Sequence, residues 1–227
     1  MARTLDLEAH AVRRDVFVDA AQRLIVTRGY EQFSIQDVLE ISEASKGAFY
    51  HYFDSKGALV DAVVDRMADQ ATIVLEPILA DPSLTAIEKL EGLFNGMARF
   101  KAERKDLVLG ILRVWESDDN TVVREKLRRI VAARLVPWLE RIVRQGVLEG
   151  SFSSRFPDQL PRVLATLVQG MSELASQLWV DRQTDAVSLE EVKRTFHAYH
   201  EAFERIVDAR PGSLKLLDDP TIEFWFA

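Results

Sequence analysis

Residues 34–53, SIQDVLEISEASKGAFYHYF, constrain the fold more than any other stretch of the chain. Ser34 can cap a short helix, because a serine hydroxyl accepts hydrogen bonds from the free N–H groups of a first turn, and Asp37 suits the positive end of that helix. A polar run, Ser42-Glu43-Ala44, interrupts the apolar spacing before Ser45, which can cap a second short helix. The stretch therefore predicts two short helices joined by a tight turn, the pattern of a helix-turn-helix.

The second of these helices has an unusual composition for a core helix. Only Phe49 and Phe53, four residues apart, suit a buried face. Small residues let a helix enter the major groove of DNA, where tyrosine and lysine can reach base edges and phosphates and an alanine methyl can contact thymine. Spacing alone is equally compatible with ordinary half-exposed surface residues. The outward surface, typical of a recognition helix, consists of Lys46, Gly47, Ala48, Tyr50 and His51.

The string SKGAFYHYFDSKGAL, preceded by FSIQDVLEIS, resembles the TetR family of bacterial transcriptional regulators, and the resemblance covers about Ala11 to Arg66. It implies that Lys46, Gly47 and Tyr50 face bases. The inter-helix turn departs from the usual Ala-Gly-Val of the family, and without glycine a backbone position with positive φ costs more free energy. The resemblance also implies contacts to backbone phosphates from Ser34, Ser45, His51, Tyr52 and Lys56.

The negative net charge of the chain argues against a mode of DNA binding that depends on positive charge alone. The formal net charge is −7, and residues 1–66 contain 8 Lys and Arg against 11 Asp and Glu, whereas DNA-binding domains are usually basic. Binding is therefore expected to use shape and helix N-termini as well as positive charge. The cations near the N-terminus or the recognition helix are Arg3, Arg13, Arg14, Lys46 and Lys56.

Composition excludes several other classes. The chain has no cysteine, which excludes disulfides, thiol redox sensing and cysteine-based metal sites. No run approaches the ~20 apolar residues of a membrane span, and the N-terminus lacks the apolar core of a signal peptide. The sequence thus predicts a soluble cytoplasmic protein with no membrane partner.

Helical periodicity continues through nearly the whole chain. Apolar residues predict a first helix from about residue 12 behind a polar arm at residues 1–8, and Ser55 can cap a long connector helix that Pro77 ends or kinks. We therefore predict an all-α fold with two domains. Residues 1–54 form an N-terminal three-helix helix-turn-helix DNA-binding domain, and residues 55–227 form a larger helical ligand-binding and dimerisation domain (about nine helices), which the connector helix joins to the first.

Residues 85–149 carry three apolar stripes, and Pro137 is expected to kink or divide the third helix. Helices of a bundle can enclose a small-molecule site between them. The same stripes are also consistent with plain core packing. The candidate effector-binding residues are the large apolar side chains Phe94, Met97, Phe100, Trp115 and Trp138.

Two regular amphipathic helices follow, from Leu160 to Trp179 and, behind the capping box Ser188-x-x-Glu191, from Leu189 to Val207. Their wide apolar stripes favour a four-helix bundle made from two copies of the pair, and the TetR resemblance implies the same homodimer. The apolar C-terminal run is expected to dock on the body or on a partner subunit. The predicted interface residues are Leu164, Leu167, Met171, Leu174, Phe196, Tyr199 and Phe203.

The sequence predicts no enzyme, no catalytic residue and no cofactor, because it lacks a nucleophile with its base, paired carboxylates and a glycine-rich phosphate loop. His197 and His200 could chelate a metal, but nothing nearby completes a site, so no metal is expected. The acidic charge leaves one alternative, a helical protein-interaction module with a degenerate helix-turn-helix. The intact Lys46, Tyr50 and Lys56 set favours a ligand-responsive homodimeric transcriptional regulator, a repressor that a small apolar or amphipathic effector releases from a near-palindromic double-stranded DNA operator.

Overall fold

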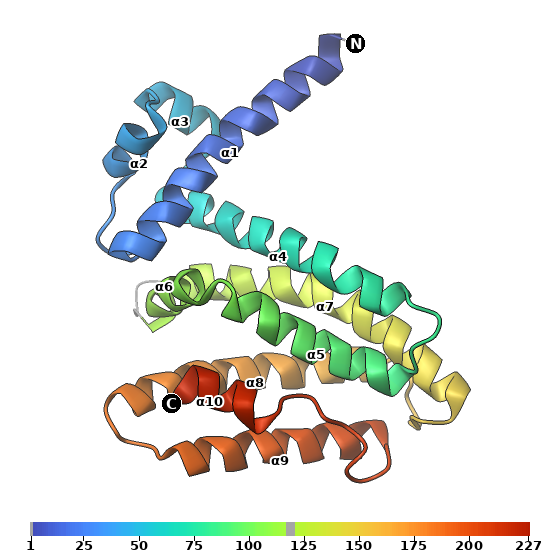
Figure 1. Cartoon of the computed structure of the whole chain (residues 1–227). Helices are drawn as coiled ribbons and strands as arrows, with labels where there is room; N and C mark the ends of the chain where they lie inside the picture. Colours follow the sequence, from blue (N-terminus) through green and yellow to red (C-terminus); the bar gives the residue numbers. More distant parts are fainter. Residues whose placement is uncertain (1, 117–120) are drawn as a thin grey trace. The chain divides into compact units, whose positions relative to one another are not determined.

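The computed structural model describes residues 2–116 and 121–227, with the side chains of residues 10–112 and 128–227. Within these residues every regular element is a helix, which confirms the predicted all-α fold (Figure 1). The helices are α1 (Ala2–Arg28), α2 (Ile35–Ser42), α3 (Lys46–Tyr52), α4 (Lys56–Ala80), α5 (Ala86–Ala102), α6 (Lys105–Glu116), α7 (Thr121–Glu149), α8 (Leu160–Gln183), α9 (Leu189–Val207) and α10 (Asp219–Phe226).

The chain forms two compact units, each with its own hydrophobic core. The first consists of residues 1–70 and 104–130, and the second of residues 71–103 and 131–227. α6 therefore belongs to the first unit, where Leu107 and Ile111 are buried in one core with residues of α1. A Cβ at Gly110 would lie 2.9 Å from the carbonyl oxygen of Ile25, so the missing side chain lets α6 approach the end of α1 closely.

In the first unit, residues of α1, α2, α3 and the first half of α4 share one hydrophobic core, which contains a cluster of aromatic rings. Phe17 of α1 contacts Phe49 of α3 edge to face, with ring centroids 5.6 Å apart, and the centroid of Phe53 lies 6.2 Å from that of Phe17. Phe49 is fully buried. The predicted pair Phe49 and Phe53 thus anchors α3.

One expectation about a helix end is wrong. α1 begins at Ala2, not after a polar arm at residues 1–8, because no proline or glycine precedes Gly29 and the local alanine, leucine, arginine and glutamate favour helix. Pro77 lies inside α4, which continues to Ala80, and Pro137 lies inside α7, so of the two effects expected of each proline the end and the division do not occur, while a kink stays a prediction. Both prolines are tolerated inside helices that continue on either side.

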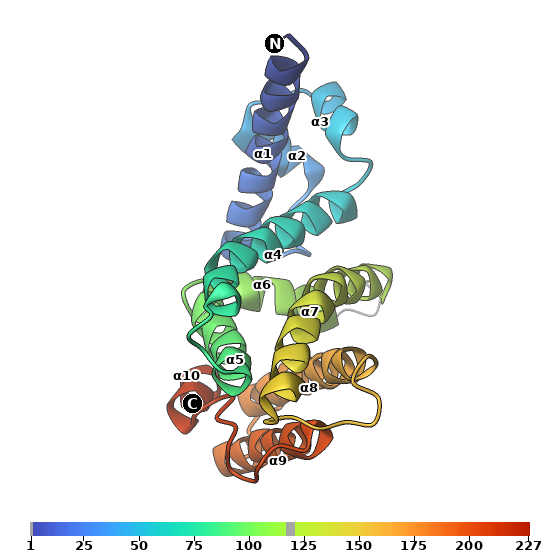
Figure 2. The ribbon, with the colours of Figure 1, turned by 90° about the vertical axis from the view of Figure 1, so that its right-hand side faces the viewer.

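In the second unit, α8 and α9 lie side by side, and α10 packs against both (Figures 1 and 2). Ser188 and Glu191 form the predicted capping box at the start of α9. The core reaches α5 through Phe94, whose ring lies 5.2 Å from that of Phe203 in an edge-to-face contact. The apolar C-terminal run docks on this body, with Phe226 buried in the same core.

The turn between α2 and α3 holds the positive-φ residue that a glycine would occupy at lower cost. Glu43 has φ 50° and ψ 36°, the left-handed conformation. Its N–H donates to the Glu40 carbonyl at 3.4 Å, and the N–H of Ala44 donates to the Leu39 carbonyl at 3.1 Å. α2 therefore ends in a left-handed cap of the kind that usually contains glycine. This cap sets the direction in which the chain leaves α2 for α3.

Replacing Glu43 with glycine should stabilise the protein by about 0.5–1 kcal/mol. Glycine adopts positive φ without the Cβ clash that costs an L-residue roughly 1–2 kcal/mol, and the entropy that it adds to the unfolded chain offsets part of this gain. Equilibrium unfolding in urea measures the change. Glu40→Gly is the matched control, because Glu40 is exposed inside α2 and glycine there should destabilise. A Glu43→Gly protein less stable than its parent would contradict this explanation.

Candidate functional site

A capping box fixes the start of α2. The Asp37 N–H donates to Ser34 Oγ at 3.2 Å, and Ser34 donates to Asp37 Oδ2 through its N–H at 2.6 Å and its hydroxyl at 2.5 Å. These hydrogen bonds from Ser34, together with the ion pair to Arg28, lower the pKa of Asp37 to about 2. Asp37 is therefore ionised at neutral pH and engages the Ser34 hydroxyl. The predicted phosphate contact of Ser34 would require that hydroxyl to change partners.

α3 begins behind a second cap, in which Ser45 Oγ accepts the N–H of Ala48 at 3.2 Å. Ser45 is exposed and its hydroxyl proton is not used by the cap, so it can donate to another group. Ala48 is half-buried and packs against the core of the first unit, and Phe49 lies inside that core. The inner side of α3 is therefore Ala48 and Phe49.

The other side of α3 faces solvent. Space is open above Gly47, where a Cβ would meet no heavy atom within 4 Å. Tyr50 exposes 46% of its surface, which is high for a tyrosine next to a packed core. The structure brings four of the predicted DNA-contacting residues together on this exposed side, namely Lys46, Gly47, Tyr50 and His51.

Tyr52, at the end of α3, is half-buried against α1. Its ring centroid lies 4.5 Å from that of His10 and 5.8 Å from that of Phe17. The His10 ring also lies 5.7 Å from the ring of His51. No sequence signal singles out His10, because it stands alone in a helix without a recognisable motif. Its place beside two predicted phosphate-contacting residues emerges only from the packing of α1 on α3.

Lys56 begins α4 and holds its ammonium group over two aromatic rings. Nζ lies 4.1 Å from the ring centroid of Tyr30 and 4.4 Å from that of Phe33, contacts that favour the charged form. Burial lowers the pKa of Lys56, an effect that the charges of Glu31 and Asp37 partly oppose. The lysine is thus a positioned cation at the start of α4 rather than a freely moving surface side chain.

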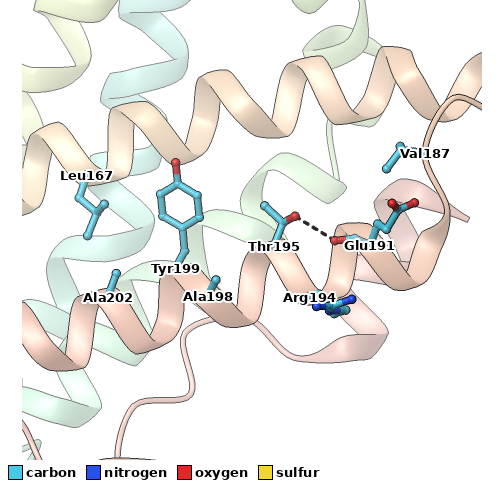
Figure 3. Close-up of a pocket in the computed structure, with 8 residues that line it drawn as sticks. All are labelled: Leu167, Val187, Glu191, Arg194, Thr195, Ala198, Tyr199 and Ala202. Carbon is cyan, nitrogen blue, oxygen red and sulfur yellow. Dashed lines mark hydrogen bonds between the residues drawn. The ribbon is translucent and has the colours of Figure 1, made fainter.

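The second unit carries an open groove of about 690 Å³ along α8 and α9 (Figure 3). In Figure 3, Leu167 projects from α8 and Tyr199 projects from α9 toward α8. The Tyr199 hydroxyl lies beside Gly170, where a Cβ would be 3.7 Å away. The residues that line the groove are Leu167, Val187, Glu191, Arg194, Thr195, Ala198, Tyr199 and Ala202.

The predicted dimer residues divide into two groups. Leu167, Leu174 and Tyr199 are partly exposed. Sequence spacing did not single out Ala198 and Ala202 of the groove, although small residues four apart on one helix face were a usable signal. The remaining predicted residues are buried inside the chain's own core, namely Leu164, Met171, Phe196 and Phe203.

Four of the five predicted effector residues lie in the core of the second unit. Phe94, Phe100 and Trp138 are buried, and Met97 is half-buried against them. Trp115 lies outside the residues whose side chains the structure describes. Four of the five residues therefore share one apolar cluster, and a ligand among them would take the place of core contacts.

The histidines of α9 make contacts within the chain. His197 Nε2 lies 2.9 Å from Asp219 Oδ1, and His200 Nε2 accepts the N–H of Leu217 at 3.2 Å. Among the described residues, no three His, Cys, Asp or Glu side chains are grouped so that they could hold a metal ion.

In that same part of the chain, no helix has both the length and the apolar character that crossing a bilayer requires.

Residues 17–63, which contain all the helix-turn-helix residues above, match the family model described as bacterial regulatory proteins, tetR family. The chain is similar to the HTH-type transcriptional repressor DhaR of Mycobacterium sp. (strain GP1), with 27% identity over 69% of this chain and 79% of that protein. It is also similar to the HTH-type transcriptional repressor KstR2 of Rhodococcus jostii (strain RHA1), with 26% identity over 66% of this chain and 72% of that protein.

Among solved structures, the fatty acid degradation regulator FadR from Bacillus halodurans shares the fold. The TM-score is 0.59 with 19% sequence identity, and the match covers 78% of this chain and 87% of that one. At this identity the structural likeness speaks for the fold alone.

Proposed function

The chain belongs to the tetR family of bacterial regulatory proteins, and from that premise we propose that it is a homodimeric repressor that a small apolar or amphipathic molecule releases from DNA. Residues 1–54 read the operator, and residues 55–227 pair the subunits and bind the effector. Because its target is DNA, we place its action in the bacterial cytoplasm. No catalytic step is assigned to it.

One observation carries the proposal: α3 is anchored on its inner side by Phe49 and presents its other side to solvent. That exposed side combines a glycine, which permits close approach to DNA, with an ammonium, a phenol and an imidazole that can donate to base edges and phosphates. Lys46, Gly47 and Tyr50 contact bases, whereas Ala48, predicted to meet a thymine methyl, packs against the core on the inner side of α3. Backbone phosphates are bound by Ser34, Ser45, His51, Tyr52 and Lys56.

The groove of α8 and α9 supports the homodimer. Leu167 and Tyr199 line an apolar surface, and Ala198 and Ala202 leave room for another helix. A second copy of the α8 and α9 pair, related by two-fold symmetry, would fill the groove and complete a four-helix bundle. A two-fold dimer presents two copies of α3, so the operator is a near-palindrome with half-sites about 34 Å apart or somewhat more.

The effector acts through elements that hold α3. Leu59 and Val63 of α4 and Leu107 of α6 are buried in the core beneath α3, and α4 continues along the chain into the second unit. An effector that binds the second unit among Phe94, Met97, Phe100 and Trp138 releases DNA by favouring a form in which α4 or α6 is displaced.

Selection of bound sequences from a pool of random DNA duplexes tests the central proposal. Enrichment of a near-palindromic sequence is the expected result, since a symmetric dimer reads two half-sites. No enrichment would favour the alternative, a helical protein-interaction module with a degenerate helix-turn-helix, which the net charge of −7 allows.

Tyr50→Ala and Lys56→Ala should weaken binding in different ways. Loss of a base contact at Tyr50 should cost roughly 1–3 kcal/mol for the selected duplex and little for a scrambled one. Loss of Lys56 should weaken both duplexes alike and reduce the slope of log affinity against log salt by about 1. Fluorescence anisotropy across a salt series measures both effects, with exposed Lys215→Ala as the control. Equal loss of specific and scrambled binding in Tyr50→Ala would refute the base contact.

Leu167→Glu should convert the dimer to a monomer, because it places an unpaired carboxylate in the proposed apolar seam. Sedimentation velocity measures the change. Leu148→Glu is the matched control, since Leu148 is 83% exposed and lies outside the groove. If the Leu167→Glu protein still sediments as a dimer, the dimer interface lies outside the groove. Phe203 is unsuitable for this test because it is fully buried in the chain's own core.

Met97→Trp should abolish the response to effector while DNA affinity and dimerisation remain unchanged, because the larger side chain fills the space that the effector would occupy. The measurement is release of the selected duplex by a compound found in a screen for release from the parent protein. Phe156→Trp, at an exposed loop residue, is the control. Unchanged release from the Met97→Trp protein would show that these aromatic residues are ordinary core.

A further inference from the structure

The chain has four histidines, and the structure places two of them together beside the end of α3. His10 lies on α1 and His51 on α3, with ring centroids 5.7 Å apart, and both side chains are exposed. Tyr52 lies against both rings, at 4.5 Å from His10 and 5.0 Å from His51. Two imidazoles from different helices therefore share one exposed surface that adjoins the proposed phosphate contacts.

Two neighbouring imidazoles suit a phosphate oxygen. A neutral imidazole offers one N–H donor, whereas an imidazolium offers two donors and a positive charge. A phosphate beside both rings favours protonation of each, because the imidazolium form adds a donor and a charge opposite to that of the phosphate.

We propose that His10 extends the DNA-contacting surface onto α1 and forms with His51 a pair that binds one backbone phosphate and takes up protons when DNA binds. The proposal rests on the proposed DNA-binding function and adds to it a contact from α1 and a dependence on pH.

The surrounding charges are compatible with this role. On α1, the guanidinium of Arg14 lies over the Phe53 ring at 5.3 Å from its centroid, one turn after His10. Asp6 stands one turn before His10 in the sequence, and Asp54 follows α3. On α3, Lys46 shares the exposed side with His51. In the proposal, the negative charge of the bound phosphate sets the direction of the proton uptake.

The direction in which DNA affinity changes with pH follows from the thermodynamic linkage between proton binding and DNA binding. If the complex holds more protons than its separate components, affinity rises as pH falls, by up to tenfold per pH unit for each proton fully taken up. Histidine titrates between about pH 8 and pH 6. An average uptake of about half a proton over these two pH units makes binding about tenfold tighter at the lower pH. A phosphate contact carries no sequence information, so the selected and scrambled duplexes should show the same dependence.

The test measures the affinity of both duplexes at constant ionic strength between about pH 8 and pH 6. The variants are His10→Gln, His51→Gln and the double variant, since glutamine keeps a polar donor but does not titrate. His197→Gln is the matched control, because His197 lies in the second unit. We expect the control to behave like the parent, each single variant to lose part of the tenfold change, and the double variant to lose it. An unchanged pH response in His10→Gln or in the double variant would overturn the proposal.

The ring protons of the four histidines give an independent measurement on the unaltered protein by NMR. Addition of the selected duplex should move the titrations of His10 and His51 to higher pH and leave those of His197 and His200 in place. If DNA does not shift the titration of His10 to higher pH, the proposed His10 and His51 pair is wrong. Failure of the parent protein to bind any duplex at low salt would instead refute the proposed function, so the two failures are distinguishable.

Discussion

The DNA-reading surface depends on the burial of one side chain, Phe49. Helices as short as α2 and α3 are not stable alone in water, because the cost of starting a helix exceeds what a few hydrogen bonds return. Burying a phenylalanine contributes about 1.5–3 kcal/mol, and its edge contact with Phe17 adds to this. The two capping serines then fix where each helix begins. With the inner side of α3 held in this way, its outer side is free to carry residues that contribute little to stability.

The sequence predicted well those features that depend on near neighbours. The caps at Ser34, Ser45 and Ser188 could be read from spacing, because capping is a contact between residues three apart. The positive φ at Glu43 follows from the same local chemistry. Recognition residues on α3 could be proposed because only the phenylalanines of that helix suit a core. The beginning of α1 was harder, since no cap or breaker residue marks it.

Features that depend on distant packing could not be predicted in this way. An apolar stripe shows that a helix side is covered but not what covers it, so Phe203 and Leu167 looked equivalent although Phe203 packs on Phe94 and Leu167 lines an open groove. The membership of α6 in the first unit depends on the fit between Gly110 and Ile25, which are far apart in the sequence. Because α4 and α6 both bury residues in that core, a displacement of either would disturb the packing under α3.

An acidic protein that binds DNA must limit the repulsion between its own carboxylates and the phosphates. Two ion pairs in the first unit reduce this repulsion, because Asp37 pairs with Arg28 and Asp19 pairs with Arg66. Each such pair offsets a negative charge but also occupies an arginine, and Lys56 is held in place by Tyr30 and Phe33. Groups that become charged on binding can add to these permanent cations. In the proposed complex, the His10 and His51 pair adds positive charge next to a phosphate, where it offsets part of the repulsion from the carboxylates.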